Sequence, residues 1–454
     1  MSTTERTASG DPILSKAVEV ESDAISSPTH GKNFSLKDFF KTDATSLSGR
    51  VRPFSEYYRQ ARGEGLLQYG REIVSSVEHR TSVRSLDGST REMIMLGSNN
   101  YLGLTTHPTV IARIKRALDE FGAGMGGPPL LGGMSQLHIE LEARLSAMKG
   151  SEDTMLYGSG YQANLGWVTT LLRNDDVLLY DEYSHASLYD GIALTVSGVE
   201  VKAIRFAHND VEHLEKLLIR ARKDTSKQFR QIFVAVEGVY SMDGDLAPLP
   251  ELSAVCHKYD AILMVDDAHS TGVMGKTGGG TGEHFDMHAG GVDMWMGSFS
   301  KALGMSGGFI SASREIIDYL RFCSRSYVFS AHLPITTIAG VLGGLDVMEA
   351  EPELFVRLHE NADYLVSALQ SLGFNTQHQA AIIPVLVPEG INIREVCRLF
   401  DQNNIFLNSI EYPAVSLDGQ RLRLSVMATH TKEDLDIAID AFARIGKQVG
   451  MIGS

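Results

Sequence analysis

The chain has 454 residues, of which 43% are hydrophobic and 21% are charged, a composition typical of a globular protein with two or three domains. Its formal net charge of −15 argues against nucleic acid as a partner and favours a cytoplasmic protein. We see no secretory signal, and the apolar stretches are shorter than the roughly 20 residues of a membrane span. Three scattered cysteines predict neither a disulfide framework nor a metal site.

The N-terminal part of the chain contains three successive segments that differ in composition and in predicted structure. Residues 1–35 are rich in Ser, Thr, Asp and Glu, and this composition predicts a flexible tail. Residues 36–95 predict an N-terminal arm with one or two helices and a short strand over Glu92–Leu96. Apolar residues at helical spacing then predict two helices, Val110–Phe121 and Leu137–Lys149.

Helices and strands alternate through the middle of the chain. We expect helices over residues 162–173, 186–197, 211–223 and 249–259, and strands over residues 176–180, 200–203, 231–237, 261–265, 292–297 and 309–312. Because these strands are almost continuously apolar, we predict an α/β fold class, with a large domain over residues 96–333 whose mostly parallel sheet is sandwiched by helices. Residues 334–454, with strands such as Ala381–Val387 between helices, predict a smaller α+β C-terminal domain.

A carboxylate and a lysine follow two successive predicted strands. Asp266 ends an apolar run in the sequence VDDAH, and Lys301 follows the next strand in GSFSKALG. Such a lysine can hold pyridoxal 5′-phosphate (PLP) as a Schiff base, and such a carboxylate can keep the pyridine nitrogen protonated so that the ring accepts electrons. The glycine, serine and apolar neighbours of Lys301 argue against an ordinary surface lysine.

Small and hydroxyl side chains near these residues predict a phosphate site. Ser159, Gly160 and Tyr161 form a turn that opens a predicted helix, where free backbone N–H groups and the helix dipole favour an anion. Ser298 and Ser300, beside the lysine, add hydroxyl donors. A helix start alone is a weak signal, because many helices begin with small residues.

Three further side chains are candidates for binding a cofactor or a substrate. His185 follows a predicted strand, where its imidazole could stack on a pyridine ring, and His269 follows Asp266 by three residues. Arg423 alternates with apolar residues as on a half-buried strand, with Arg421 on the same face. A guanidinium at that position suits a substrate carboxylate, although a structural ion pair is the simpler interpretation of an isolated arginine.

Together these segments resemble the α-oxoamine synthases, PLP-dependent enzymes of the aspartate-aminotransferase fold (fold type I). The resemblance runs from about Tyr57 to the C-terminus. It rests on the segments SNNYLGL, LHIELE, SGYQAN, SHASLYDG, EGVYSMDGDLAPL, VDDAHSTGVMG, GSFSKALG, FSAHLP and RLRLSVMATHT. The residues around Lys301 look most like those of bacterial serine palmitoyltransferases.

The resemblance implies roles for individual residues. Lys301 would form the Schiff base, Asp266 would pair with the pyridine nitrogen, His185 would stack on the ring, and His269 would contact the phenolic oxygen. The resemblance implies a phosphate site made by Gly160, Tyr161, Ser298 and, from a second subunit, Ser330. It implies a site for the amino-acid carboxylate made by Asn99 and Arg423, with Ser241 nearby. We therefore expect a homodimer with active sites at the interface.

The implied reaction is a decarboxylative condensation of an amino acid with an acyl thioester, giving an α-amino ketone. L-Serine and a long-chain acyl-CoA are the best guess. The stretch Gly126–Gly133 departs from the family pattern, because it contains Pro128 and Pro129 where a Gly-Ser-Arg or Gly-Thr-Arg turn is usual. Another amino acid, or an acyl chain on a carrier protein, is therefore an alternative, and a non-catalytic partner subunit is a second one.

Overall fold

The computed structural model describes residues 39, 42–196, 202–223, 229–287, 290–412 and 414–453. The tail predicted over residues 1–35 lies outside this set. By their contacts, the described residues divide into two compact units, one that ends at Leu67 and one that begins at Gln68.

The first unit contains one long helix. Helix α1 (Leu47–Gly63) begins after Ser46, whose hydroxyl accepts a hydrogen bond from Gly49 N at 3.1 Å. The ring of Phe54 packs edge-on against Phe39, with 5.4 Å between the ring centroids. The helix agrees with the arm that the mixed charged and aromatic sequence predicts.

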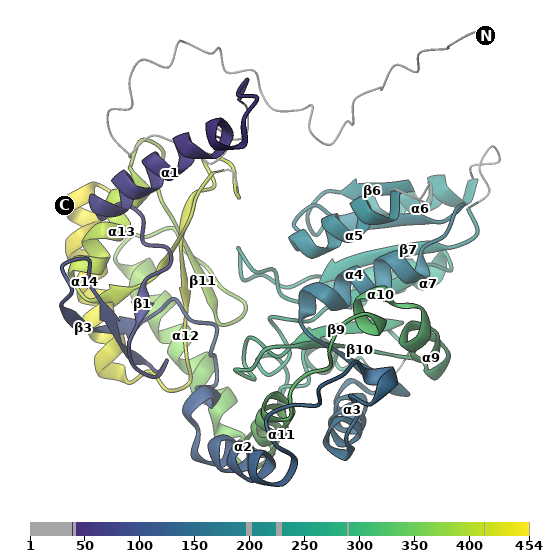
Figure 1. Ribbon diagram of the computed structural model, residues 1–454. Helices are drawn as coiled ribbons and strands as arrows, with labels where there is room; N and C mark the ends of the chain where they lie inside the picture. Colours follow the sequence, from purple (N-terminus) through teal and green to yellow (C-terminus); the bar gives the residue numbers. More distant parts are fainter. Residues whose placement is uncertain are drawn as a thin grey trace. The chain divides into compact units, whose positions relative to one another are not determined.

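A seven-stranded sheet forms the centre of the second unit (Figure 1). Its strands are β4 (Asp153–Tyr157), β5 (Val177–Asp181), β6 (Lys202–Phe206), β7 (Ile232–Glu237), β8 (Ile262–Asp266), β9 (Met294–Ser298) and β10 (Gly308–Ala312). Their order across the sheet is β4-β10-β9-β8-β7-β5-β6, and only β10 pairs antiparallel to both of its neighbours. Parallel strands align their carboxyl ends at one edge, where ligand sites of such sheets lie.

Helices cover both faces of this sheet because successive strand residues face opposite ways. Leu178 packs in one cluster, with residues of α4 (Gly160–Leu171), α5 (Ala186–Val196), α9 (Arg314–Cys323) and α10 (Arg325–Val328). Its neighbour Leu179 packs in another, with residues of α6 (Val211–Lys223) and α7 (Leu249–Lys258). The α/β fold class with a helix-covered, mostly parallel sheet is confirmed.

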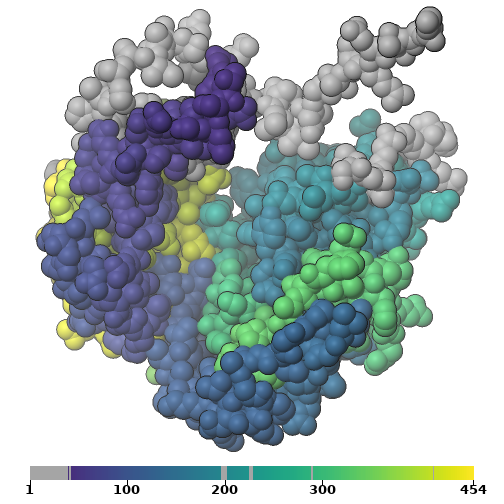
Figure 2. All heavy atoms as spheres, viewed as in Figure 1, coloured from purple at the N-terminus to yellow at the C-terminus, as the bar shows by residue number. Residues whose placement is uncertain are grey.

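A third group of helices packs beside the sheet. Helix α11 (Ile335–Ala350) lies against α2 (Pro108–Phe121) and α3 (Gln136–Lys149) (Figure 1). In the space-filling view of Figure 2 the blue atoms of α3 and the green atoms around α9 lie side by side on one face. Arg321 of α9 donates to Glu142 of α3 at 2.9 Å, which ties these two helices together.

The C-terminal part has its own small sheets. Strands β11 (Ile382–Leu386), β14 (Arg421–Ser425) and β13 (Asn408–Ile410) form one antiparallel sheet. Strands β1 (Glu72–Ile73), β2 (Arg80–Arg84) and β3 (Thr90–Met95) form another with β12 (Ile405–Phe406), in which Ile405 pairs with Ile94 from the far end of the chain. Helices α12 (Glu353–Ser371), α13 (Ile393–Gln402) and α14 (Lys432–Val449) pack on these sheets around one apolar core.

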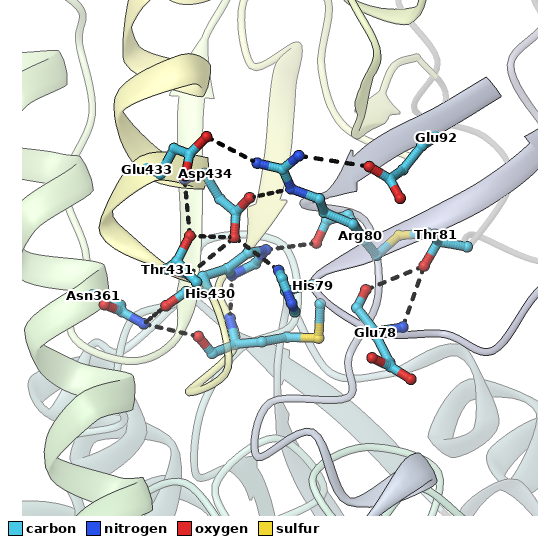
Figure 3. Close-up of polar contacts among 12 residues, drawn as sticks. Glu78, His79, Arg80, Thr81, Glu92, Asn361, His430, Thr431, Glu433 and Asp434 are labelled. Carbon is cyan, nitrogen blue, oxygen red and sulfur yellow. Dashed lines mark hydrogen bonds and ion pairs between the residues drawn. The ribbon is translucent and has the colours of Figure 1, made fainter.

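The buried carboxylate of Asp434 links residues at the start of β2 to α14 through hydrogen bonds and ion pairs (Figure 3). Asp434 accepts hydrogen bonds from Arg80 Nε at 2.6 Å and from Thr431 Oγ1 at 2.8 Å, and its Oδ2 lies 2.8 Å from His79 Nδ1. Thr431 caps the helix, and its hydroxyl accepts from Asp434 N. Burial would raise the pKa of Asp434, but these donors lower it to about 2. The cluster therefore stabilises the junction only while Asp434 is charged.

Most predicted elements occur within a few residues of their expected ends, and the differences are informative. The strand expected over residues 200–203 is β6, Lys202–Phe206, and the strand expected to be half-buried around Arg423 is buried along all five residues. No helix among the described residues is long and apolar enough to cross a membrane. The domain boundaries given above stay a prediction.

Candidate active site

A cavity of about 340 Å³ opens where the main sheet's parallel strands end. Its lining comes from the segments that follow β4, β5, β7, β8 and β9. That volume lies in the range of roughly 300–1,000 Å³ that is usual for small-molecule sites. The cavity brings together ten of the predicted site residues: Ser159, Gly160, Tyr161, His185, Ser241, Asp266, His269, Ser298, Ser300 and Lys301.

Asp266 ends β8 with two donors that favour its charged form. Its Oδ2 accepts from Asn164 Nδ2 at 2.8 Å, and its Oδ1 accepts from Ala268 N at 3.1 Å. Burial raises the pKa of Asp266, and the hydrogen bond from Asn164 opposes this rise. The carboxylate is thus suited to face a cation, such as a protonated pyridine nitrogen.

A second carboxyl group, that of Glu237, lies beside Asp266. Glu237 ends β7 in register with Asp266, so both side chains reach the cavity. Burial and the neighbouring Asp266 raise the pKa of Glu237 well above its usual value. Its Oε1 has no hydrogen-bond partner among the described residues, whereas each oxygen of Asp266 has one. Two adjacent buried carboxyls do not both ionise readily, and burial together with the charge of Asp266 favours the protonated form of Glu237.

Lys301 enters the cavity from the turn after β9. Burial lowers the pKa of its amine, and the charge of Asp266 opposes this shift. A larger share of neutral amine makes the lysine a better nucleophile toward an aldehyde and a better acceptor of protons. The structure therefore places the predicted lysine and carboxylate in one cavity.

The start of α4 provides an anion site at the same cavity. Ser159 caps the helix by accepting from Gln162 N at 3.1 Å, and Gly160 is the first helical residue. A Cβ on Gly160 would lie 3.2 Å from Ser298 Cβ, so glycine allows the closest approach here. The hydroxyls of Ser298 and Ser300 lie 2.8 Å apart. Helix N–H groups and two hydroxyls match the needs of a phosphate.

The two predicted histidines both line the cavity, with different partners. His185 Nδ1 lies 2.7 Å from the hydroxyl of Ser187 and accepts from Ser187 N at 3.2 Å, which leaves Nε2 as the protonated nitrogen. His269 Nδ1 lies 2.9 Å from the hydroxyl of Tyr101. Burial lowers the pKa of His269 well below its usual value, and the neighbouring charge of Lys301 adds to this. His269 is therefore neutral.

Three predicted residues do not line the cavity. Arg423 donates to Asn99 Oδ1 from Nη1 at 3.2 Å and from Nη2 at 3.3 Å, and its Nε donates to Ser241 O at 2.6 Å. Asn99 and Arg423 thus contact each other, and Arg423 also contacts Ser241, which lines the cavity. Ser330 donates to Ala331 O at 3.2 Å, and its assignment to a second subunit stays a prediction.

Sequence reasoning missed Asn164, Glu237 and Tyr101. Glu237 carried the same signal as Asp266, an acid at the end of an apolar strand. Asn164 follows Gly160 by one helical turn, which places it on the face of α4 that meets the sheet. Tyr101 had no signal beyond its place in the segment SNNYLGL, because its contact with His269 joins residues 168 positions apart.

The cavity fits PLP at both of its ends. The start of α4 and the serine hydroxyls offer donors for a phosphate, while Asp266 offers a fixed anion for a pyridine nitrogen. Lys301 supplies the amine that an aldehyde requires. The residues that fit PLP lie at the carboxyl ends of three strands, β4, β8 and β9.

Comparison with known proteins identifies the family. The family model described as aminotransferase class I and II matches residues 91–442. The 8-amino-7-oxononanoate synthase of Thermoanaerobacter pseudethanolicus is 37% identical over 368 residues, which cover 81% of this chain and 90% of that protein. The 4-hydroxy-2,2'-bipyrrole-5-methanol synthase PigH of a Serratia species is 36% identical over 418 residues, or 92% of this chain. The match spans only 62% of PigH.

A solved structure extends the comparison to three dimensions. The serine palmitoyltransferase of Sphingomonas wittichii superposes with a TM-score of 0.82 at 32% identity, covering 90% of this chain and all of that one. These matches confirm fold type I and PLP as the cofactor. The chain belongs to the aminotransferase class I and II family and, within it, to the PLP-dependent α-oxoamine synthases.

Proposed function

We propose that this enzyme condenses an amino acid with an acyl thioester and releases CO₂, giving an α-amino ketone. L-Serine and a long-chain acyl-CoA are the substrates that we favour, with 3-ketosphinganine as the product. The observation that carries the proposal is the single cavity that holds Lys301, Asp266, His185 and His269 beside an anion site. The match to a serine palmitoyltransferase structure over 90% of this chain supports the choice of substrates.

In this proposal each residue of the site has a separate role. PLP, when bound, supplies an electron sink for the bond that breaks at the α-carbon. Asp266 would hold a proton at the pyridine nitrogen of bound PLP, and the imidazole of His185 would stack on its ring. The Nζ atom of Lys301, with its lowered pKa, takes the α-proton of the amino acid. Arg423 orients the amino-acid carboxylate, which must leave as CO₂ in a later step.

The proposed enzyme is a homodimer with its active sites at the subunit interface. Leu131 is 84% exposed and Phe329 is 76% exposed. They belong to 3-10 helix η3 (Pro129–Leu131) and to the end of α10, which contact each other. Large apolar side chains gathered on one surface are typical of a contact between subunits. Ser330 follows Phe329 directly, which suits its assignment to the phosphate of a partner. A cytoplasmic location completes the proposal.

A second candidate is a synthase of specialised metabolism with another amino acid or a carrier-bound acyl chain. Its support is the match to PigH over 92% of this chain and the proline-containing stretch Gly126–Gly133. In that stretch His332 N donates to Gly127 O at 3.1 Å, and His332 Nδ1 donates to Gly133 O at 2.8 Å. A non-catalytic partner subunit is disfavoured, because Lys301, Asp266 and both histidines line one cavity.

One experiment separates these candidates. The purified protein is loaded with PLP, and its visible spectrum is titrated with each amino acid. Products from acyl-CoAs of several lengths, and from the same chains on acyl carrier protein, are then measured by mass spectrometry. Turnover of serine with long-chain acyl-CoA supports the first proposal. A preference for another amino acid, or for a carrier-bound chain alone, overturns it in favour of the second.

A further inference from the structure

Four side chains, Arg423, Asn99, Tyr101 and His269, lie in a row with each neighbouring pair at hydrogen-bond distance. Two guanidinium nitrogens of Arg423 donate to Asn99 Oδ1 at 3.2 and 3.3 Å. Asn99 Oδ1 lies 3.2 Å from the hydroxyl of Tyr101, which lies 2.9 Å from His269 Nδ1. Of these four residues, only His269 lines the cavity. This row therefore joins the predicted carboxylate site to the cavity through two residues that lie behind its wall.

The proton of the Tyr101 hydroxyl can go to Asn99 Oδ1 or to His269 Nδ1, while the side chains of Arg423 and Ser425 also interact with this hydroxyl and oppose the rise in its pKa that burial causes. Asn99 Oδ1 has two lone pairs, and it already faces two donors from Arg423 and the hydroxyl of Ser425 at 3.3 Å. His269 Nδ1 has no other partner among the described residues. Tyr101 is fully buried, and burial raises the pKa of its phenol, so the hydroxyl keeps its proton. The free acceptor, His269 Nδ1, therefore receives it.

We propose that Tyr101 is a positioning residue that fixes His269 with its proton on Nε2, and that Asn99 links this arrangement to Arg423. A neutral imidazole that accepts at Nδ1 must carry its proton at Nε2. In this form His269 offers the cavity an N–H donor, which suits an anionic oxygen such as that of the PLP phenol. Without the Tyr101 hydroxyl, nothing in the described contacts selects between the two neutral forms.

The link to Arg423 follows from the same count of lone pairs. A carboxylate that binds Arg423 draws guanidinium donors away from Asn99 Oδ1. A lone pair of Asn99 then becomes available to the Tyr101 hydroxyl, which weakens the bond from Tyr101 to His269. His269 thereby responds to events at Arg423 without touching the amino acid. This part rests on the proposed function, because it takes Arg423 as the carboxylate site.

The first test uses the PLP-free protein with ¹⁵N-labelled histidine, where the nitrogen resonances report which ring nitrogen carries the proton. His269→Gln identifies the His269 signals. We expect protonated Nε2 in the wild type, a mixture of both neutral forms in Tyr101→Phe, and a smaller shift toward that mixture in Arg423→Lys. Tyr157→Phe is the matched control, because it removes another buried tyrosine hydroxyl, one that donates to Ser324 at 3.1 Å. It should leave His269 unchanged.

Protonated Nδ1 in the wild type, or an unchanged His269 in Tyr101→Phe, would overturn the positioning role. An unchanged His269 in Arg423→Lys would overturn the link through Asn99. Both results are independent of the substrates, so an error in the proposed function cannot produce them.

The second test uses the PLP-loaded enzyme and its preferred substrates. Tyr101→Phe should lower kcat by about twofold to tenfold, the effect of one lost hydrogen bond of average strength, while the KM for the acyl thioester stays the same. The pH profile of kcat should also change, because Nδ1 of His269 no longer accepts the Tyr101 hydroxyl proton and is open to a proton from solution. Loss of activity with an unaltered pH profile and an unaltered ¹⁵N spectrum would mean that Tyr101 acts only through stability, and the proposal would be wrong.

Discussion

Replacement of Asp266 by asparagine tests whether a charge is needed at the end of β8. The carboxylate accepts from Asn164 Nδ2 at 2.8 Å and from Ala268 N at 3.1 Å, one donor to each oxygen. An amide has a single oxygen, so one of these donors loses its acceptor, and the cofactor's pyridine nitrogen loses its anion. A charge-assisted hydrogen bond contributes about 1.5–3 kcal/mol, which corresponds to a loss of about tenfold to more than a hundredfold in turnover.

The assay compares PLP content and turnover in the same preparations. Asp266→Asn should still bind PLP through Lys301 and the phosphate site, while kcat falls by the factor above. Asp176→Asn is the matched control, since Asp176 is also a buried carboxylate that accepts two backbone N–H groups, from Arg173 and Gln231. It precedes β5, at the opposite end of the strands from the cavity. Near-normal turnover in Asp266→Asn, or an equal loss in the control, would refute the assignment of Asp266.

Three further predictions concern the substrate site, the phosphate site and the junction of the sheets. Arg423→Lys keeps the charge but loses the planar fork, so spectral titration should show at least about tenfold weaker amino-acid binding, with the spectrum before titration unchanged; an unchanged Kd would move the carboxylate site elsewhere. Gly308→Ala places a Cβ 2.6 Å from Gly160 N, so PLP affinity should fall about tenfold or more, and a normal affinity would contradict the proposed phosphate site. Asp434→Asn should lower the free energy of unfolding by about 2–3 kcal/mol near pH 7, because the pKa of Asp434 is about 2 in the folded protein, against an ordinary value near 4. A carboxylate with a lowered pKa stabilises the folded protein at every pH above its pKa in the unfolded chain, and this stabilisation is lost as the pH falls toward 2. The difference in unfolding free energy between the wild type and Asp434→Asn, measured with denaturant, should therefore shrink below about pH 4. A difference that stays constant with pH would exclude this cause.

The sequence was sufficient to predict the main sheet and the residues at its edge. Apolar strands alternating with amphipathic helices define a parallel sheet, and parallel strands bring their carboxyl ends to one edge. Asp266 and Lys301 follow neighbouring strands β8 and β9, so local pattern alone was enough to place them near each other. Ser159 and Gly160 follow from the same logic, because a helix begins directly after β4.

The contacts between distant segments could not be predicted in this way. Strand β12 has only two residues and pairs with β3, and no local pattern indicates a pairing across such a distance. The bonds from Arg423 to Asn99 and to Ser241 depend on how β14 lies against two loops of other elements. For the same reason the strand periodicity around Arg423 predicted its face correctly but not its full burial.

Glu237 and Asp266 show a second kind of feature that the sequence alone could not predict. Glu237 and Asp266 have the same sequence signal, an acid at the end of an apolar strand, and both line the cavity. Only the structure distinguishes them, because Asn164 and the Ala268 N–H donate to Asp266, while Oε1 of Glu237 has no partner among the described residues. Hydrogen bonds from another helix and another loop thus favour the charged form of Asp266.

The attachment of PLP to Lys301 is the central claim and can be measured directly. Borohydride reduction of the PLP-loaded protein fixes a lysine–PLP bond, and mass spectrometry of the digested protein then identifies the modified residue. The account predicts that the wild type carries the label on Lys301 and that Lys301→Ala carries no reducible bond and has no turnover. A label on another lysine, or a reducible PLP bond that persists in Lys301→Ala, would contradict it.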